Sequence, residues 1–152
     1  MQPISGPIKD LAWSPDNQRM VCVGEGREKF GHVFLADTGT SNGDITGQSR
    51  PINSCDFRPA RPFRIITGSE DNTAAYYEGP PFKFKGTKND HGRYCQAVRY
   101  SPDGAFWASA GFDGKLVRMT YIFSYFKACK MANLNPSSSS CTRARTLSWL
   151  PR

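Results

Sequence analysis

The chain has no long hydrophobic run. No stretch approaches the roughly 18–20 consecutive apolar residues that a membrane-spanning helix needs, and Met1 is not followed by the charged and apolar regions of a signal peptide. We therefore expect neither a secreted nor a membrane-spanning protein. The 152 residues suit one domain, and a hydrophobic fraction of 38% is not typical of a disordered chain.

Residues suited to catalysis or to metal binding are scarce. His32 and His91 are the two histidines, and no serine or cysteine stands in a nucleophile motif. The five cysteines occur singly and never as a Cys-x-x-Cys pair: Cys22, Cys55, Cys95, Cys129 and Cys141. This spacing disfavours a zinc site or a disulfide framework and fits a reducing compartment. We expect no enzyme, no cofactor, no metal and no small-molecule substrate.

Charge is distributed unevenly along the chain. The sequence carries 20 Lys and Arg against 13 Asp and Glu, a formal net charge of +7. Residues 116–152 contain six of the cations and no acid, so the remainder of the chain is close to neutral. A basic protein often binds nucleic acid or a membrane surface. Because the excess lies in the tail, we expect neither partner.

An internal repeat organises residues 8–115. Three segments that begin near residues 8, 52 and 95 share an alternating apolar pattern, followed by an aromatic residue and a proline two positions later. The aromatic residues Trp13, Phe57 and Tyr100 lie 44 and 43 residues apart. A period of about 40–45 residues built from strands and turns is typical of β-propeller blades. We therefore expect an all-β fold.

Each repeat predicts four short antiparallel strands, which together make one blade. The first strands begin at the repeats themselves, and turns follow them at 14–17, 58–61 and 101–104. Second strands are predicted at 64–67 and 106–109, third strands at 32–36 and 73–77, and weaker fourth strands at 43–46 and 82–85. The chain thus holds about two and a half to three blades, an incomplete propeller.

The Ser-Pro-Asp-Gly turn at 101–104 and the Ser-Ala-Gly-Phe-Asp-Gly run at 109–114 resemble the WD-repeat propellers. In that family a buried His, a Ser or Thr and an Asp tie the turns of a blade together. The resemblance assigns this network to His91, Ser109 and Asp113. The second blade has Thr-Gly-Gln at 46–48 where the histidine would stand, and its network is expected to be incomplete. From the residues alone, His91 as a general base is the weaker alternative.

Three stretches of sequence narrow the resemblance to one family of WD-repeat proteins. Residues 24–31, 68–72 and 78–85, the last reading Glu-Gly-Pro-Pro-Phe-Lys-Phe-Lys, are similar to the actin-interacting family of WD-repeat proteins, which assists cofilin in taking actin filaments apart. The similarity covers about residues 6–115. It implies actin filaments and cofilin as partners and a cytoplasmic, cytoskeletal location. The family folds as two seven-bladed propellers, so the chain would be a truncated form.

The resemblance also implies a partner-binding surface made of Glu28, Glu70, Lys83, Phe84 and Tyr94. An aromatic residue flanked by lysines is a plausible anchor on an acidic partner. The pattern alone favours another reading, in which Phe82 and Phe84 face the interior and the lysines are solvated. The resemblance reverses that preference. A cation bound at the acidic turn of residues 70–71 is the less favoured reading, because turn chemistry explains those acids.

The repeat pattern stops after Lys115. We divide the chain into a partial propeller at 1–115 and a non-homologous basic tail at 116–152, with few ordered contacts expected over 120–152. The opposite reading of the tail is a basic amphipathic anchor, for which the helical pattern is poor. Two further functions stay open beside actin binding: a general WD-repeat scaffold, and a non-functional fragment whose open blades leave apolar faces uncovered.

Overall fold

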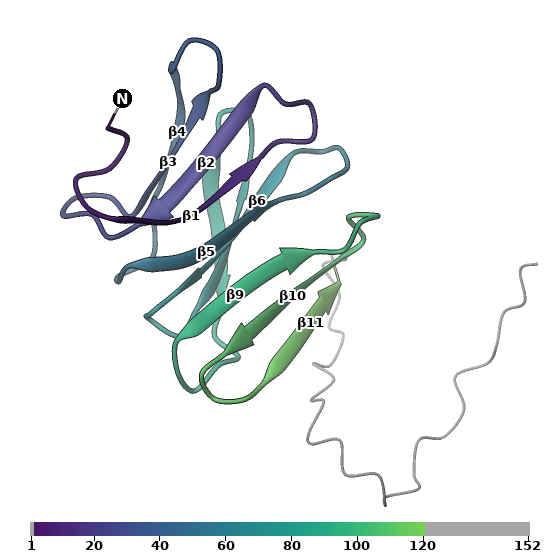
Figure 1. The fold of residues 1–152 in the computed structure, drawn as a ribbon. Helices are drawn as coiled ribbons and strands as arrows, with labels where there is room; N and C mark the ends of the chain where they lie inside the picture. The colour runs from purple at the N-terminus through teal and green to yellow at the C-terminus, as the bar shows by residue number, and fades with distance from the viewer. Residues whose placement is uncertain (1, 121–152) are drawn as a thin grey trace, which may run out of the picture.

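A computed structural model describes residues 2–120 as eleven β-strands in three antiparallel sheets (Figure 1). The first sheet contains β1 (Ile8–Trp13), β2 (Arg19–Gly24), β3 (Gly31–Leu35) and β4 (Ser41–Ile45). The second contains β5 (Ile52–Phe57), β6 (Arg64–Ser69), β7 (Ala74–Glu78) and β8 (Lys83–Lys88). The third contains β9 (Cys95–Tyr100), β10 (Phe106–Gly111) and β11 (Leu116–Thr120). Residues 2–120 include no helix that is long and apolar enough to cross a membrane.

The strands follow the chain in order within each sheet, as consecutive hairpins do. This arrangement confirms the all-β prediction and the expected blades, each with its first strand, turn and second strand in the predicted order. At the turn before β10, the Gly104 N–H donates to the Ser101 carbonyl over 2.8 Å. Gly104 has a φ of +67°, which an L side chain adopts only with strain, so glycine suits this turn.

Neighbouring sheets pack through their first strands. Strand β5 lies against β1 and β2, and β9 lies against β5 and β6, so β1, β5 and β9 succeed one another down the molecule in Figure 1. This succession is the stacking of propeller blades. We number the sheets as the first, second and third blade.

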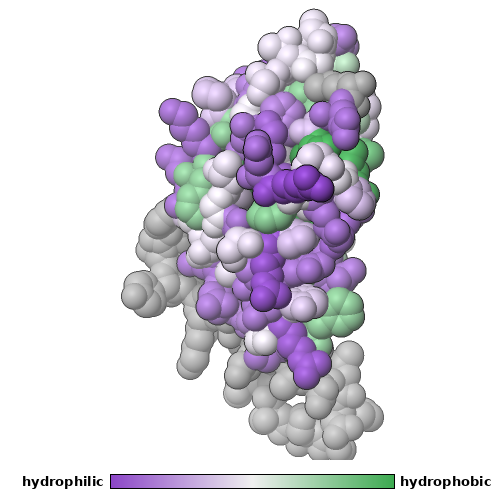
Figure 2. Space-filling model, turned by 90° about the vertical axis from the view of Figure 1, so that its left-hand side faces the viewer, coloured by the Kyte–Doolittle hydropathy of each residue, from purple (hydrophilic) through white to green (hydrophobic). Residues whose placement is uncertain are grey.

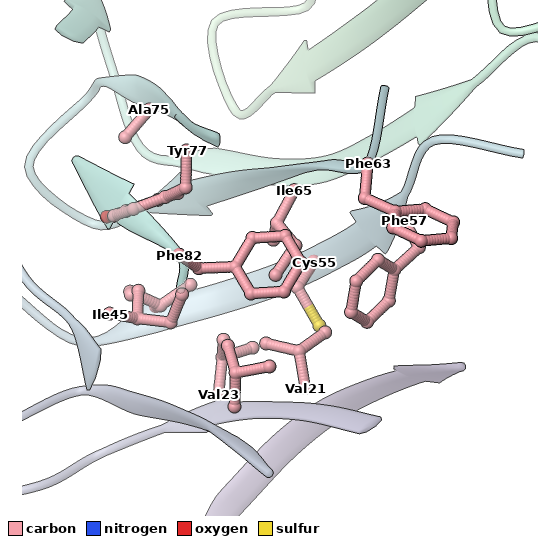
Figure 3. Packing of buried hydrophobic residues seen from close by; sticks show 12 residues of the cluster. Val21, Val23, Ile45, Cys55, Phe57, Phe63, Ile65, Ala75, Tyr77 and Phe82 are labelled. Atoms are coloured by element: carbon pink, nitrogen blue, oxygen red, sulfur yellow. The ribbon is translucent and has the colours of Figure 1, made fainter. Parts of the chain in front are cut away.

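Apolar side chains fill both junctions between blades. Between the first and second blades, Val21 and Val23 point toward Cys55 and Phe82 in a cluster of twelve buried residues (Figure 3). A second cluster, which includes Trp107, lies between the second and third blades. Cys22, Cys55 and Cys95 are buried, which confirms that they act as small apolar residues.

Polar bonds to the backbone cross the same junctions. One carboxylate oxygen of Asp10 accepts bonds from the Ser54 hydroxyl over 2.9 Å and from the Cys55 N–H over 3.1 Å. Further along, Asp56 accepts the Tyr100 N–H over 2.7 Å. The first strands of the first and second blades, β1 and β5, therefore each offer a carboxylate to the first strand of the next blade, which fixes how the blades sit on one another.

The third blade contains the residues to which the resemblance assigns the turn network. Nε2 of His91 lies 2.8 Å from the Ser109 hydroxyl, and Nδ1 lies 3.2 Å from Asp113. The other Asp113 oxygen accepts the Gly92 N–H over 2.8 Å. Burial opposes ionisation of Asp113, but the N–H groups of Gly92 and Lys115 and the His91 imidazole hold the pKa of that carboxyl well below its ordinary value.

The expectation of an incomplete network in the second blade is wrong, because Gln48 takes the place of the histidine. Its amide oxygen accepts the Thr67 hydroxyl over 2.6 Å, and its nitrogen donates to the Thr73 carbonyl over 3.2 Å. Asp71 accepts the Ser49 N–H over 3.0 Å, as Asp113 accepts that of Gly92. A glutamine amide supplies the donor and the acceptor that the turn requires.

The predicted boundary at residue 115 falls immediately before β11. Residues 116–120 form this strand, which pairs with β10 from Ala110↔Leu116 to Phe106↔Thr120. The third blade thus extends five residues past the predicted boundary. The rest of the predicted tail, residues 121–152, lies outside the described residues.

Candidate partner-binding surface

One end of the three blades is built by equivalent loops. The loop after each second strand is hydrogen-bonded to the residue before the first strand of the same blade. The Glu25 N–H donates to the Pro7 carbonyl over 2.9 Å, and the Glu70 N–H donates to the Pro51 carbonyl over 3.0 Å. In the third blade Phe112 N–H donates to the Tyr94 carbonyl over 2.9 Å. We call this end, made of residues 25–30, 46–51, 70–73, 89–94 and 112–115, the loop face.

Lys9 joins the loops of the first two blades on this face. Its ammonium nitrogen lies 2.9 Å from Glu25 and 2.7 Å from Glu70, and it donates to the Asn53 side-chain oxygen over 3.0 Å. Partial burial lowers the pKa of Lys9, but its hydrogen bonds to Glu70 and Glu25 outweigh that and raise it. Asn53 in turn donates to the Cys95 carbonyl over 3.2 Å, one residue after Tyr94.

Three of the five sequence-predicted binding residues therefore lie on the loop face. Glu28 is exposed in the loop 25–30, at a shallow hollow of about 400 Å³ that residues 2–5 also line. Glu70 is partly exposed beside Lys9, and Tyr94 is exposed at the third blade. Glu70 and the backbone next to Tyr94 are connected through Lys9 and Asn53, so these two positions are held together.

Lys83 and Phe84 lie at the start of β8, the outermost strand of the second blade. The Phe84 ring meets the Tyr77 ring edge-on, with centroids 5.9 Å apart. It also covers Gly47, where a Cβ would lie only 2.6 Å from the ring. Gly47, in the loop that leads into β5, has a φ of +91°. Glycine therefore suits this position, because a side chain would be strained by the backbone conformation and would clash with the Phe84 ring.

The structure shows that Phe82 and Phe84 differ in burial, which the alternating pattern alone could not reveal. Phe82 is 3% exposed and belongs to the cluster between the first two blades, whereas Phe84 is 40% exposed. Phe84 lies at the rim of the second blade, where its ring contacts Tyr77 and Gly47 and stays partly exposed. The reading in which both rings face the interior therefore holds for Phe82 and is wrong for Phe84.

Sequence reasoning missed Phe112, which is 63% exposed on the loop face. Its ring meets that of Tyr94 at 90°, with centroids 6.3 Å apart. In the repeat, Phe112 occupies the position of Glu70, since both follow the second strand and bond back to the preceding loop. Aligning the repeats at that position would have identified it.

One side of the surface is mainly polar. On the side drawn in Figure 2, hydrophilic residues predominate and hydrophobic ones form separate patches. Among the described residues no group of His, Cys, Asp and Glu could hold a metal ion. Burial raises the pKa of the Cys22 and Cys55 thiols, and that of Cys95 to about 12, so they stay protonated near neutral pH. At the five sequence-predicted positions and Phe112, the surface presents aromatic rings and charges.

The blades and their turns define a class of protein. The family model described as "WD domain, G-beta repeat" matches residues 39–78 and 82–117, and the chain belongs to this WD40 family. Each matched repeat includes the outer strand of one blade and the inner strands of the next: β4 with β5–β7, then β8 with β9 and β10.

Within this class the chain is similar to particular relatives. It is 76% identical to Actin-interacting protein 1 of Drosophila melanogaster over 76% of the chain and 19% of that protein. It is 61% identical to Actin-interacting protein 1 of Caenorhabditis elegans over 74% of the chain and 18% of that protein. WD repeat-containing protein 1 of Bos taurus is 49% identical over 99% of the chain and 24% of that protein. The chain spans about a fifth of the length of these relatives.

Proposed function

We propose that the chain is an actin-filament-binding WD40 protein that promotes cofilin-dependent disassembly of actin filaments. Two relatives that carry the name Actin-interacting protein 1 support this, at 76% and 61% identity. The partners are actin filaments and cofilin, and the location is the actin cytoskeleton of the cytoplasm. The protein acts through a binding surface and catalyses no reaction.

The observation that carries the proposal is the exposure of Phe84 beside Lys83. A partly exposed aromatic ring supplies contact area at small entropic cost, and an adjacent lysine complements an acidic partner. Lys83 is exposed and its side chain makes no hydrogen bond or ion pair with the described residues, so its charge is available. Phe84 is held by Tyr77 and the Gly47 loop, so its ring is already oriented before a partner arrives.

The loop face adds the remaining contacts. Tyr94 offers a second aromatic surface, to which we add Phe112 because its ring packs against that of Tyr94. Glu28 and Glu70 provide negative charge, and Glu70 also forms an ion pair with Lys9. A filament surface with both acidic and basic groups is complementary to such a mixture.

Co-sedimentation with actin filaments, with and without cofilin, tests the proposal. The double variant Lys83→Ala, Phe84→Ala is introduced into a longer relative that carries this segment. We expect a loss of about 2 kcal/mol or more, which is roughly 30-fold in affinity for cofilin-decorated filaments. The control is Thr87→Ala, an exposed position on the same strand.

A thermal melt of each variant accompanies the binding assay. Because Phe84 is at the rim, the melt should change little while binding falls. Unchanged binding with an unchanged melt removes Lys83 and Phe84 from the site. The chain alone should bind more weakly than the longer relative, because three blades without further neighbours hold the contact residues less rigidly. Absence of any actin binding by the longer protein would favour a general WD-repeat scaffold.

A further inference from the structure

The turn after the first strand of the second blade differs from its counterparts in the other two blades. Between the last paired residues of the two strands that it joins, the second blade has residues 58–64, whereas the first and third blades have 14–19 and 101–106. The second turn is thus one residue longer. It reads Arg-Pro-Ala-Arg-Pro-Phe-Arg and contains no acid, whereas each counterpart contains an aspartate. We call residues 58–64 the arginine turn.

The two counterparts are closed by their own side chains. In the third blade the Ser101 hydroxyl accepts the Phe106 N–H over 3.0 Å, and Ser14 forms the same bond in the first blade over 2.9 Å. Each serine also bonds the aspartate two positions further on. Arg58 and Ala60 replace this serine and aspartate in the second blade. The arginine turn therefore has positive charge in place of an internal bonding pattern, which indicates a role beyond joining two strands.

Contacts with both neighbouring blades hold the arginine turn in place. Phe63 is 8% exposed, lies near Phe57 in the cluster between the first two blades (Figure 3), and has Arg19 of the first blade over its ring, 5.4 Å from the centroid. On the other side, the Arg58 guanidinium donates to the Gly104 carbonyl of the third blade over 3.0 Å. A Cβ at Gly104 would lie only 3.2 Å from the Arg58 side chain, so these two turns are in close contact.

Arg61 is an exposed cation at the tip of this turn. Its guanidinium lies over the Phe63 ring, 5.0 Å from the centroid, in a cation–π contact. Its side chain makes no hydrogen bond or ion pair with the described residues, whereas Arg19 is paired with Asp16 over 2.6 Å. A guanidinium that rests on a ring keeps the N–H groups along its edge available, and these suit a carboxylate in two parallel bonds.

Positive charge continues across the same end of the second blade. Arg64 of the turn pairs with Glu78 on β7, and Glu78 pairs with Lys83 on β8, so all three residues lie in one row across the sheet. The Glu78 carboxylate accepts Arg64 over 2.7 Å and lies 3.5 Å from the Lys85 ammonium. Three cations thus surround one acid in this row, and Arg61 adds a fourth.

We propose that the arginine turn binds an acidic segment of a partner protein, with Arg61 donating to one of its carboxylates. A guanidinium that is already oriented loses less conformational freedom on binding. Asp16 and Asp103 stand in the turns on either side. An extended anionic surface such as nucleic acid would meet these acids and be repelled, whereas a single acidic segment needs to contact only the second blade. The inference does not rest on the proposed function, since Arg61 is not among the residues assigned to actin binding.

Titration of a dye-labelled hexaglutamate peptide with the full chain, followed by fluorescence anisotropy, tests the proposal. The wild type should bind the peptide saturably, and more weakly as ionic strength rises. Arg61→Glu should weaken binding about tenfold or more, because it removes a charge-assisted contact and adds a like charge. Arg61→Lys keeps the charge without the planar fork and should lie between the two. Arg93→Glu makes the same charge change at an exposed position on the loop face and should bind as the wild type does.

Amide spectra of the isotope-labelled chain locate the peptide. Localisation is needed because the cations beyond residue 120 also attract a polyanion. With the wild type, the signals of the arginine turn and of Gly104 should shift as peptide is added. In Arg61→Glu these shifts should disappear, while unchanged signals from the buried strands verify that the variant folds.

Four results would overturn the proposal. The first is a chain that shows no saturable binding of the peptide. The second is binding that Arg61→Glu leaves intact, and the third is a set of peptide shifts that excludes residues 58–64. The fourth is an arginine turn that ignores hexaglutamate but binds a single-stranded oligonucleotide or phosphatidylserine vesicles through Arg61, since it would then recognise phosphate surfaces.

Discussion

The second and third blades form the same turn with different side chains. In the third, the imidazole of His91 bonds Ser109, and in the second, the amide of Gln48 bonds Thr67. Both blades then hold an aspartate whose carboxylate accepts a loop N–H. The comparison teaches that the turn requires one donor and one acceptor at fixed places, and that a titratable ring is not essential.

The two blades also differ in their surroundings. The second blade is covered on both sides and contributes to both apolar clusters. The third is covered on one side among the described residues, and its own buried apolar residues are Cys95, Val98, Trp107 and Val117. The second blade should therefore be the more sensitive to loss of core volume, and the third to loss of ionised groups.

The largest effect is expected for Phe82→Ala in the second blade. Phe82 is buried between the first two blades, where its ring meets that of Phe57 edge-on with centroids 5.6 Å apart. Truncation removes the ring and leaves a cavity, at a cost of about 3–5 kcal/mol in the free energy of unfolding. Urea unfolding measures it, with Phe84→Ala as the matched control. Equal losses for the two variants would contradict the placement of Phe84 at the rim.

Gln48→Ala should be the next largest. It leaves the buried Thr67 hydroxyl without its acceptor, for a loss of about 1–3 kcal/mol. Gln48→His, which copies the third blade, should lie within about 1 kcal/mol of the wild type. Chemical denaturation of both variants measures the difference. If the alanine variant is as stable as the histidine variant, the amide bonds contribute nothing.

Acid should weaken the third blade through Asp113. Its pKa is lower in the folded chain than the ordinary value of 3.8, so its stabilising effect is complete above that value and is lost as the pH falls through the folded pKa. Asp113→Asn should cost about 1 kcal/mol at pH 7 and progressively less below pH 4. Melts across this range measure it, and the exposed Asp37→Asn is the control. A cost independent of pH would contradict the assignment.

The smallest effect is expected for Lys9→Met, which removes the ion pair with Glu25 within the first blade and the ion pair with Glu70 that links the second blade to the first. Partly exposed pairs contribute less than about 1 kcal/mol and are screened by salt. Unfolding at low and high ionic strength should show a small loss that disappears in salt. Lys88→Met, at an exposed position on β8, serves as control. A loss that persists in high salt would show that the lysine stem acts through packing.

Local signals predicted the strands and turns well. The alternation before Trp13, Phe57 and Tyr100 and the prolines after them act within a few residues, so the three first strands follow from the sequence. The strand β11 was missed as part of the blade, because Leu116–Thr120 lacks the family pattern although it pairs fully with β10. Pairing with a neighbour overrode a weak local signal.

The resemblance predicted which residues are candidates for binding a partner. It did not predict how these residues are arranged in space. No local rule predicts that Phe82 and Phe84 differ in burial. They differ because Phe82 packs in the junction between the first two blades, whereas the Phe84 ring packs against Gly47. No local rule finds Gln48 either, since its acceptor role is set by Thr67, nineteen residues along the chain. These distinctions depend on contacts between segments far apart in sequence.

The sequence by itself determined the period of the repeat, the order of strands in each blade and the residues that turn the chain, because these depend on φ preferences and on side chains two positions apart. Only the tertiary structure decided which apolar positions are buried. Leu11 and Cys55 occupy one position of the same repeat, yet one is exposed and the other enclosed. The reason is physical: a strand sets the direction of a side chain, and the adjacent blade decides whether water reaches it.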